Sequence, residues 1–323
     1  MLDKELRVLE ILNRNSGISQ RSIAAAADIS IGNVNSIIKH LVEDGYISID
    51  KHSRKSRYVV NKKGLDALEE HINGAINKKI IIPKHDKKVN TAVVLAAGES
   101  PNFDKPVGFL PLGRKTIIER ILDILEEYGI ENIIVVAGYE SHYYEKLAKE
   151  RKISLVKNRK YKSTGTMTSL AAAKDLIKDD FILIESDIVF EKRAIGEVLK
   201  NENRDCVLIS SVSGSGDEVF VEIRNTFIFK MSKDKHQFNK IDGEMIGISK
   251  ISIDIYKKML EEFSGNSNPY LNYEYVLLDV ARTYNIGYAK IEDLIWTEID
   301  TQWHYSNLVN FIFPMLENRE KHK

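Results

Sequence analysis

The chain has 323 residues, of which 43% are hydrophobic and 29% charged, and its 47 basic and 47 acidic side chains cancel to a net charge of zero. This length predicts about two domains. The balanced charge does not imply wholesale affinity for nucleic acid or anionic lipid, so any basic surface must be local. The single cysteine, Cys206, excludes an internal disulfide framework and a thiolate zinc site. Because the N-terminus is charged and no apolar run approaches ~18–20 residues, we expect a cytoplasmic protein without a membrane partner.

The first part of the chain predicts three helices and a two-stranded wing. Leucines recur near helical spacing over residues 2–12, and Ser19 and Ser30 are suited to cap the next two helices. Residues 46–60 predict two short strands around a basic tip, and residues 64–76 predict a last helix. We therefore expect a small, mostly helical domain that ends with this helix.

A change of pattern then divides the chain. Residues 77–90 are rich in lysine and lack clear periodicity, so we expect a linker between a domain of residues 1–76 and one of residues 91–323. Beyond the linker, short apolar runs such as Ala92–Ala97 alternate with helical segments. Continuous apolar runs are typical of strands buried on both faces. The alternation predicts an α/β domain with a mixed, mostly parallel sheet covered by helices on both faces.

The turn after the first parallel strand is the first candidate site. Ligands of open α/β sheets bind beyond the carboxyl ends of the strands, and small residues there let backbone N–H groups approach a base or a phosphate. Lys105 lies seven residues beyond Gly98 and is predicted to reach the same phosphates. The alternative is an ordinary loop with a solvent lysine. The predicted nucleotide-binding residues of this turn are Leu95, Ala96, Ala97, Gly98 and Glu99.

Two acidic pairs follow apolar runs at predicted strand ends. They are Glu185-Ser186-Asp187 and Glu298-Ile299-Asp300. Since Mg²⁺ prefers one or two protein carboxylates together with phosphate oxygens and water, we predict that Asp187 and Asp300 hold one Mg²⁺ on a nucleotide. The alternative is that each is a turn or capping aspartate.

A polar segment between a predicted strand and a predicted helix is a further candidate. Gly165 permits a close approach, and Thr166 and Ser169 offer hydroxyls and N–H groups of the first helical turn to a nucleotide. The alternative is a well-capped helix without a ligand.

Taken together, these motifs carry a resemblance. Residues ~91–305 resemble the bacterial CTP:phosphocholine cytidylyltransferases, on the segments Ala92–Gly98, Lys105-Pro106, Leu110–Gly113 with Ile118–Arg120, Asn158…Leu170, Glu185–Asp187, Gly243–Ile248 and Trp296–Asp300. The resemblance implies a Rossmann-like nucleotidyltransferase that transfers CMP from CTP to a phosphocholine-like acceptor and releases pyrophosphate. It also implies catalytic roles for Lys105, Asp187 and Asp300. The family usually carries an arginine in the first loop, and this chain has Asn102 at that position.

The sequence is less informative about the residues that would bind the acceptor substrate. A choline headgroup needs aromatic faces around its cation, and an acidic side chain suits an amine. The predicted acceptor-binding residues are Tyr161, Glu185, Tyr273, Glu274 and Trp303. Core packing is the alternative for the aromatic side chains. Two other functions stay open: a transcription regulator whose large domain senses a nucleotide or headgroup, and a sugar-1-phosphate nucleotidyltransferase.

The N-terminal segments Ile18–Arg21, Ile29–Val34 and Leu41–Ile47 resemble a winged helix-turn-helix domain. The resemblance implies that duplex DNA is a partner. The second helix of the motif is predicted to present short polar side chains to the major groove, and the wing is predicted to contact phosphates. The alternative is a module that docks on the large domain or forms a homodimer. The predicted DNA-binding residues are Asn33, Asn35, Ser36, Lys39, Arg54, Lys55 and Arg57.

Overall fold

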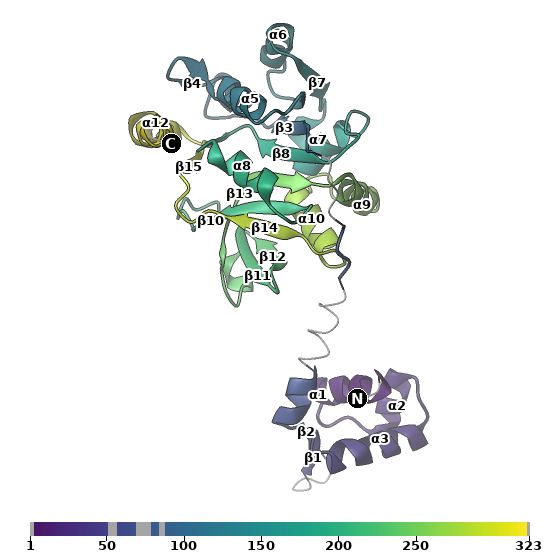
Figure 1. The fold of residues 1–323 in the computed structure, drawn as a ribbon. Helices are drawn as coiled ribbons and strands as arrows, with labels where there is room; N and C mark the ends of the chain where they lie inside the picture. Colours follow the sequence, from purple (N-terminus) through teal and green to yellow (C-terminus); the bar gives the residue numbers. More distant parts are fainter. Residues whose placement is uncertain (1–2, 51–56, 69–78, 84–87, 322–323) are drawn as a thin grey trace. The chain divides into compact units, whose positions relative to one another are not determined.

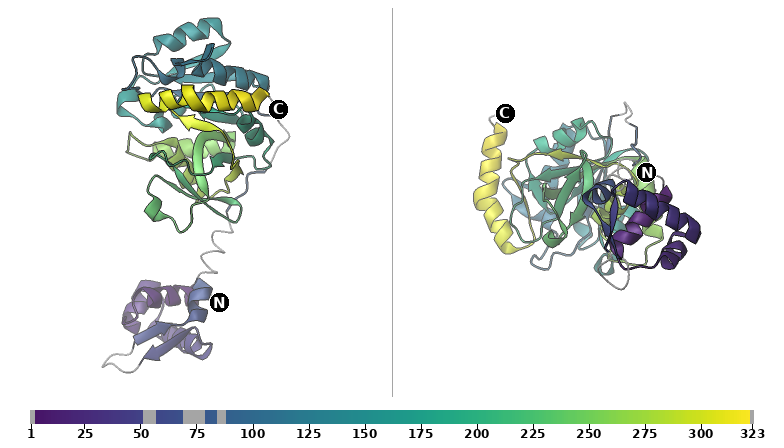
Figure 2. Two further views of the ribbon diagram at one scale, coloured as in Figure 1. Left: turned by 90° about the vertical axis from the view of Figure 1, so that its left-hand side faces the viewer. Right: turned by 90° about the horizontal axis from the view of Figure 1, so that it is seen from below.

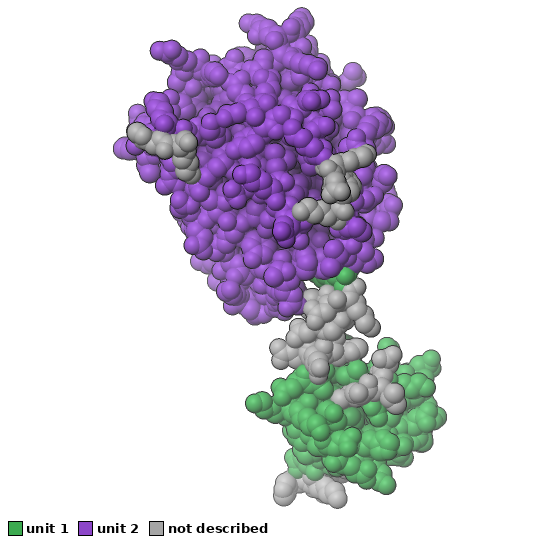
Figure 3. Space-filling view, in the orientation of Figure 1, with its two compact units in different colours: residues 1–79 green, residues 80–323 purple. Residues whose placement is uncertain are grey.

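The computed structural model describes residues 3–50, 57–68, 79–83 and 88–321. They form two compact units, residues 1–79 and residues 80–323, which are described separately (Figure 3). No helix in these described ranges is long and apolar enough to cross a membrane.

Among its described residues, the small unit contains the helices α1, α2 and α3 and a two-stranded antiparallel sheet (Figure 1). Ser19 and Ser30 cap the second and third helices, as predicted, because each side-chain oxygen accepts a hydrogen bond from a backbone N–H three residues later. Buried apolar side chains from all three helices and both strands form its core. Residues 62–68 are also helical, whereas the rest of the predicted last helix lies outside the described residues. The elements are α1 (Asp3–Arg14), α2 (Gln20–Ala27), α3 (Ile31–Glu43), β1 (Ile47–Asp50) and β2 (Arg57–Val60).

The large unit begins inside the segment that we predicted as a linker. The Ile80 N–H donates to the Thr283 carbonyl, and the Ile80 carbonyl accepts from the Asn285 N–H, both at 2.8 Å. These two backbone hydrogen bonds attach Ile80 to the large unit, because this short apolar stretch finds an extended partner there.

A mixed sheet of nine strands organises the large unit (Figure 1). Its central block β8-β3-β6-β7 is parallel, as the apolar runs predicted. Beyond β8 lies β13, which pairs antiparallel with β8, β10 and β11, and β10 also pairs parallel with β14. The strands are β3 (Thr91–Ala96), β6 (Asn132–Ala137), β7 (Ile153–Lys157), β8 (Phe181–Glu185), β10 (Cys206–Ser210), β11 (Phe220–Arg224), β12 (Phe227–Ser232), β13 (Gly243–Ile251) and β14 (Gly287–Lys290).

Helices cover both faces of this sheet. The alternation along β3 shows the two layers, since Ala92 and Val94 pack in one apolar cluster while Val93 and Leu95 pack in the other. The first cluster includes side chains of α5 (Ile117–Glu127), α6 (His142–Glu150) and α8 (Arg193–Lys200), and the second includes those of α7 (Thr166–Ala172), α9 (Ile253–Ser264) and α10 (Tyr273–Ala281).

The C-terminal segment crosses one side of the large unit as a nearly continuous helix (Figure 2). Its parts are α11 (Gln302–Asn307), a π-helical turn (Leu308–Ile312) and α12 (Phe313–Lys321). Leu308 and Leu316 are fully buried and attach this helix to the first apolar cluster.

Two short ladders complete the fold. The hairpin of β4 (Pro111–Leu112) and β5 (Lys115–Thr116) precedes α5. The antiparallel pair of β9 (Ile188–Phe190) and β15 (Trp296–Glu298) joins segments that are far apart in the chain.

The start of α5 provides a test of the fold. Thr116 and Glu119 form a capping box, in which the Thr116 N–H donates to Glu119 Oε2 at 2.7 Å and the Glu119 N–H donates to Thr116 Oγ1 at 3.4 Å. We expect Thr116→Ala to lower the free energy of unfolding by about 1 kcal/mol. Thr116→Ser keeps the hydroxyl and should stay close to wild type. Urea unfolding followed by tryptophan fluorescence reports on the large unit, which contains both tryptophans; equal stability of the two variants would contradict the assignment.

Candidate active site

Two adjacent cavities open where β3 and β8 end. The first cavity, of about 290 Å³, is lined by loop residues 95–102, by Thr166 and Ser169, and by Glu185–Asp187 and Asp300 among others. The second cavity, of about 190 Å³, lies toward β13 and α10. Thr166, Glu185 and Asp187 line both cavities and therefore form a shared wall.

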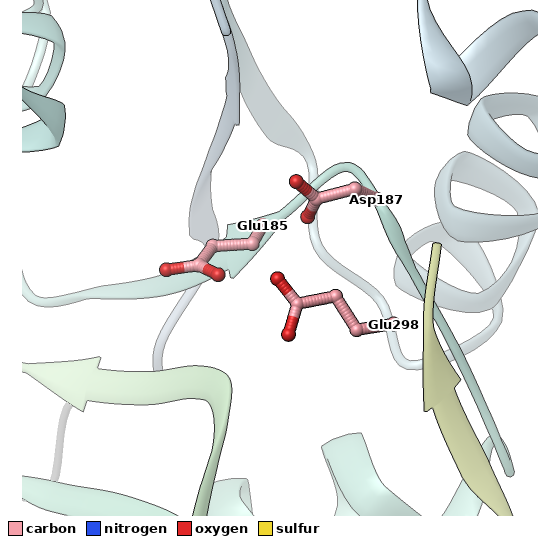
Figure 4. Close-up of side chains that lie close together, drawn as sticks. All are labelled: Glu185, Asp187 and Glu298. Atoms are coloured by element: carbon pink, nitrogen blue, oxygen red, sulfur yellow. The ribbon is translucent and has the colours of Figure 1, made fainter. Parts of the chain in front are cut away.

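Three carboxylates meet at this wall. One oxygen from each of Glu185, Asp187 and Glu298 lies within 4.8 Å of the others, and the side chains point toward one another (Figure 4). Glu185 ends β8, Asp187 follows in the turn, and Glu298 ends β15. The β9–β15 ladder brings them together, and the hydrogen bond from the Ile299 N–H to the Asp187 carbonyl, at 2.9 Å, continues it by one residue.

The acidic residues lie where two strands end. Glu185 ends β8, and Ser186 and Asp187 form the turn before β9, while Ile299 and Asp300 follow Glu298 at the end of β15. The residues between them, Ser186 and Ile299, are buried.

Burial and mutual repulsion raise the pKa of each carboxyl in this cluster. Desolvation, followed by the charge of Asp187, raises the pKa of Glu185 to about 8. Desolvation raises the pKa of Asp187 to about 6, with a contribution from Asp300. Desolvation and the charges of Asp187 and Glu185 raise the pKa of Glu298 to about 9. The raised pKa values favour the protonated form of all three groups, because burial disfavours their charge and the carboxylates repel one another.

The cluster suits a hard divalent cation. Asp187 Oδ1 is buried and has no hydrogen-bond partner within the described part of the chain, so it is free to bind one. Carboxylate oxygens are the ligands that Mg²⁺ and Ca²⁺ prefer. A bound cation would also remove the repulsion that raises these pKa values.

Gly247 on β13 makes room for Glu185. Its φ is +65°, and a Cβ built there would lie 2.9 Å from Glu185 Oε2. Any other residue would therefore be strained and would push the Glu185 carboxylate away.

The start of α7 is fixed by the start of α10. The Thr166 N–H donates to Asn272 Oδ1 at 3.2 Å, and the Tyr273 N–H donates to Thr166 Oγ1 at 3.0 Å. Gly165 was predicted to admit a nucleotide, but the close neighbour in the structure is the chain's own backbone, since a Cβ there would lie 2.4 Å from the Leu271 carbonyl oxygen.

Most of the predicted ligand-binding residues line the two cavities. The first cavity is lined by ten of them, three of which also line the second cavity, and the second cavity adds two acceptor candidates. The ten are Leu95, Ala96, Ala97, Gly98, Glu99, Thr166, Ser169, Glu185, Asp187 and Asp300, and the two are Tyr273 and Glu274.

Four predicted residues lie elsewhere. Lys105 and Gly165 do not belong to the lining of either cavity, and neither do Tyr161 and Trp303. Trp303 is 70% exposed at the start of α11. Among the described lining residues, Lys233 of the segment after β12 is the one basic side chain, and it pairs with Asp217 at 2.7 Å.

Sequence reasoning missed several lining residues. Glu298 joins the tight cluster, whereas we had assigned the metal to Asp187 and Asp300. The repeated pattern of glutamate and aspartate two residues apart at predicted strand ends was a usable signal, because it marks both members of each pair as candidates. Asp217, Lys233 and Glu244 had no such signal, since they come from turns and from the antiparallel part of the sheet.

In the small unit, α3 exposes Asn33, Asn35, Ser36 and Lys39, while Val34, Ile38 and Leu41 are buried. Arg57 is exposed at the start of β2. The other two predicted wing residues, Arg54 and Lys55, lie outside the described residues.

Comparison with known proteins agrees with this geometry. Residues 92–235 match the family of the MobA-like NTP transferase domain, and residues 1–48 match a winged helix-turn-helix DNA-binding family. The chain carries an NTP transferase domain behind an N-terminal winged helix-turn-helix domain.

Relatives of the NTP transferase domain are diverse. The bifunctional protein GlmU of Methanococcus maripaludis is 30% identical over 175 residues, which is 51% of this chain and 41% of that protein. A choline-phosphate cytidylyltransferase of Haemophilus influenzae is 29% identical over 106 residues, 31% of this chain and 45% of that protein. These matches span less than half the length of either relative.

A solved structure shares the fold of the NTP transferase domain. It is the inositol-1-phosphate CTP transferase from T. maritima, with a TM-score of 0.62 and 18% identity. The match covers 72% of this chain and 97% of that one.

The raised pKa values predict how pH and metal act on stability. An acidic group whose pKa is raised on folding stabilises the fold only while it stays protonated. The metal-free chain should therefore lose stability as pH rises from about 5, above the ordinary carboxyl pKa near 4, to about 9, the raised pKa of Glu298. Mg²⁺ binds the ionised form, so its affinity should rise over this range, and at 100 times its dissociation constant it should restore about 2.7 kcal/mol.

Calorimetry from pH 5.5 to 9, in EDTA and in Mg²⁺, measures both effects. The matched variant Glu298→Gln removes one titrating carboxyl and should flatten the pH dependence. A wild-type transition that is insensitive to pH and to Mg²⁺ would contradict the electrostatic account.

Proposed function

We propose that the large unit is a Mg²⁺-dependent cytidylyltransferase, which transfers CMP from CTP to a phosphorylated amine and releases pyrophosphate. The observation that carries the proposal is the wall of carboxylates between two cavities. A nucleotide in the first cavity and an acceptor in the second would meet at this wall. Glu185 and Asp187, together with Glu298 or Asp300, would hold the ion.

The reaction is a direct displacement. An oxygen of the acceptor's phosphate or phosphonate attacks the α-phosphorus of CTP and forms a new P–O bond. The bond from the α-phosphorus to the oxygen bridging to the β-phosphorus breaks, and pyrophosphate leaves with its electron pair. Mg²⁺, when bound, supplies charge neutralisation for the triphosphate. The chain's own residues align the two substrates, which is where most of the catalysis would come from.

Protein groups have different tasks in this scheme. The loop after β3 presents small residues and backbone N–H groups to the nucleotide. Ser169 holds this side of the cavity through Asn158, whose Nδ2 donates to Ser169 Oγ at 3.0 Å. Lys233 is the one basic side chain among the described lining residues, so it is suited to bind the acceptor's phosphate. It would then give up its present ion pair with Asp217.

The second cavity favours an acceptor with a positive charge. Glu244 and Glu274 are buried there, and desolvation raises the pKa of each. Trp296 and Tyr273 line the same cavity and offer aromatic surface to an ammonium group. An amine would compensate the negative charge of these buried carboxylates, which a neutral sugar would not do. The name of the H. influenzae relative, a choline-phosphate cytidylyltransferase, agrees with this choice.

Removal of one central carboxylate tests the metal role. We expect Asp187→Asn to lower kcat by about 10²–10³, by analogy with the loss of one charge-stabilising group. Pyrophosphate release with CTP, phosphocholine or phosphoethanolamine, and Mg²⁺ measures this loss. Asp175→Asn changes an exposed aspartate outside both cavities and serves as the matched control. Near-normal turnover by Asp187→Asn would refute the role.

The same assay separates the other functions. All four nucleoside triphosphates should be tested against phosphorylated amines and sugar 1-phosphates. A preference for a sugar 1-phosphate would replace the acceptor that we propose. Binding of CTP without pyrophosphate release from any acceptor would favour a nucleotide sensor.

We further propose that the small unit binds duplex DNA. Its match to a winged helix-turn-helix DNA-binding family and the exposed polar side chains along α3 support this second function. Asn33, Asn35 and Ser36 would face base edges, and Lys39 would contact the backbone.

Salt dependence tests DNA binding. We expect the affinity for random duplex DNA to fall as salt rises, because phosphate contacts release counterions. Lys39→Ala should weaken binding and reduce the slope of log K against log salt by about 1. Lys4→Ala removes an equal charge from the exposed surface of α1 and should act less. No gel shift even at low salt would rule this function out.

A further inference from the structure

Asn102 connects the loop of the first cavity to the segment that carries Asp300. Its Nδ2 donates to the Asp300 backbone carbonyl at 2.7 Å. In the opposite direction, Gln302 Nε2 donates to the Asn102 backbone carbonyl, also at 2.7 Å. These two hydrogen bonds form a clasp between segments about 200 residues apart in the chain.

The clasp lies where regular structure ends on both sides. On one side, β3 stops at Ala96, and the loop that follows lines the first cavity. On the other side, the last hydrogen bond to the β9 segment is made by the Ile299 N–H, one residue before Asp300. The Asp300 backbone is then held by Asn102 and by its own N–H, which donates to His304 Nδ1 at 3.2 Å.

Nearby contacts keep the fold in place without Asn102. The Tyr305 hydroxyl donates to the Pro111 carbonyl at 2.8 Å, and the rings of Tyr305 and Phe103 meet edge to face at 6.2 Å. The clasp therefore has little to add to global stability, since exposed hydrogen bonds contribute modestly. What it fixes is the backbone from which the Asp300 side chain lines the first cavity; the carboxylate itself is partly exposed and lies 3.6 Å from His304 Nδ1.

We infer that Asn102 is a positioning residue, which acts through the Asp300 backbone to hold the Asp300 carboxylate at the first cavity. The inference rests on the proposed function, and it takes Asp300, rather than Glu298, as the carboxylate that joins Glu185 and Asp187 at the Mg²⁺–nucleotide complex. Asn102 touches neither the ion nor the reacting atoms in this role. It keeps Asp300 and the loop at one separation while ligands enter and leave.

Two variants break the clasp from either side. Asn102→Ala removes the donor to Asp300, and Gln302→Ala removes the donor to Asn102. Each should raise the dissociation constant of Mn²⁺, used as a spectroscopic substitute for Mg²⁺, by about 10-fold, because supporting partners of metal-binding groups have effects of this size. In turnover, kcat should fall on the order of 10-fold, while the melting temperature stays at the wild-type value. The double variant should be little worse than either single one, since both changes break the same unit.

Three measurements on the full chain decide the question. Electron paramagnetic resonance counts free Mn²⁺, steady-state pyrophosphate release gives kcat and KM, and hydrogen exchange reports on peptides covering residues 98–105 and 299–304. Asn310→Ala, which changes an exposed asparagine of the C-terminal helix, is the matched control. Faster exchange in both peptides with weaker Mn²⁺ binding supports the inference. Unchanged exchange, or unchanged Mn²⁺ affinity in an active protein, overturns it.

Failure of the proposed function gives a different result. A wild-type chain that neither binds Mn²⁺ nor releases pyrophosphate refutes the function. The clasp is then judged by hydrogen exchange alone: it stands as a structural link if Asn102→Ala speeds exchange in both peptides, and it fails if exchange does not change.

Discussion

The short ladder between β9 and β15 is the constraint on which the site depends. It pairs three residues of each strand, and the hydrogen bond from Ile299 to Asp187 continues it to the edge of the cavities. Without it, the acidic segments that end β8 and β15 would have no reason to meet, because their carboxylates repel one another. The ladder and the buried residues between the acids hold together side chains that would separate in water.

The repulsion between the carboxylates is confined to the site, and the large sheet holds the strand ends that carry them in place. The parallel block is buried on both faces, so its strand ends are rigid points from which polar side chains project. Repulsive charges on such a frame are typical of functional sites, where local preferences and global fold disagree. Gly247 is a further adaptation of this site, since its missing side chain leaves room for the Glu185 carboxylate.

The sequence predicted the architecture well because its signals are local. Apolar runs mark strands buried on both faces, and Ser19 and Ser30 cap helices with their own side chains. The site was only partly predictable, because strand register and turn geometry decide which acids meet. Glu298 lies in the tight cluster for this reason, and Lys105, which chain spacing had favoured, does not line either cavity. Gly165 was expected to make room for a nucleotide, whereas its close neighbour is backbone from a segment about a hundred residues away.

The shared wall has a thermodynamic consequence. Glu185 and Asp187 border both cavities, so an occupant of either one changes the electric field felt by the other. A cation that binds with one ligand neutralises carboxylates that would otherwise repel a second, anionic ligand. Linkage requires that this help be mutual: each ligand tightens the other by the same factor. Occupancy of the pair should then rise more steeply than two independent equilibria allow, and half-filled sites should be fewer than independent binding would give.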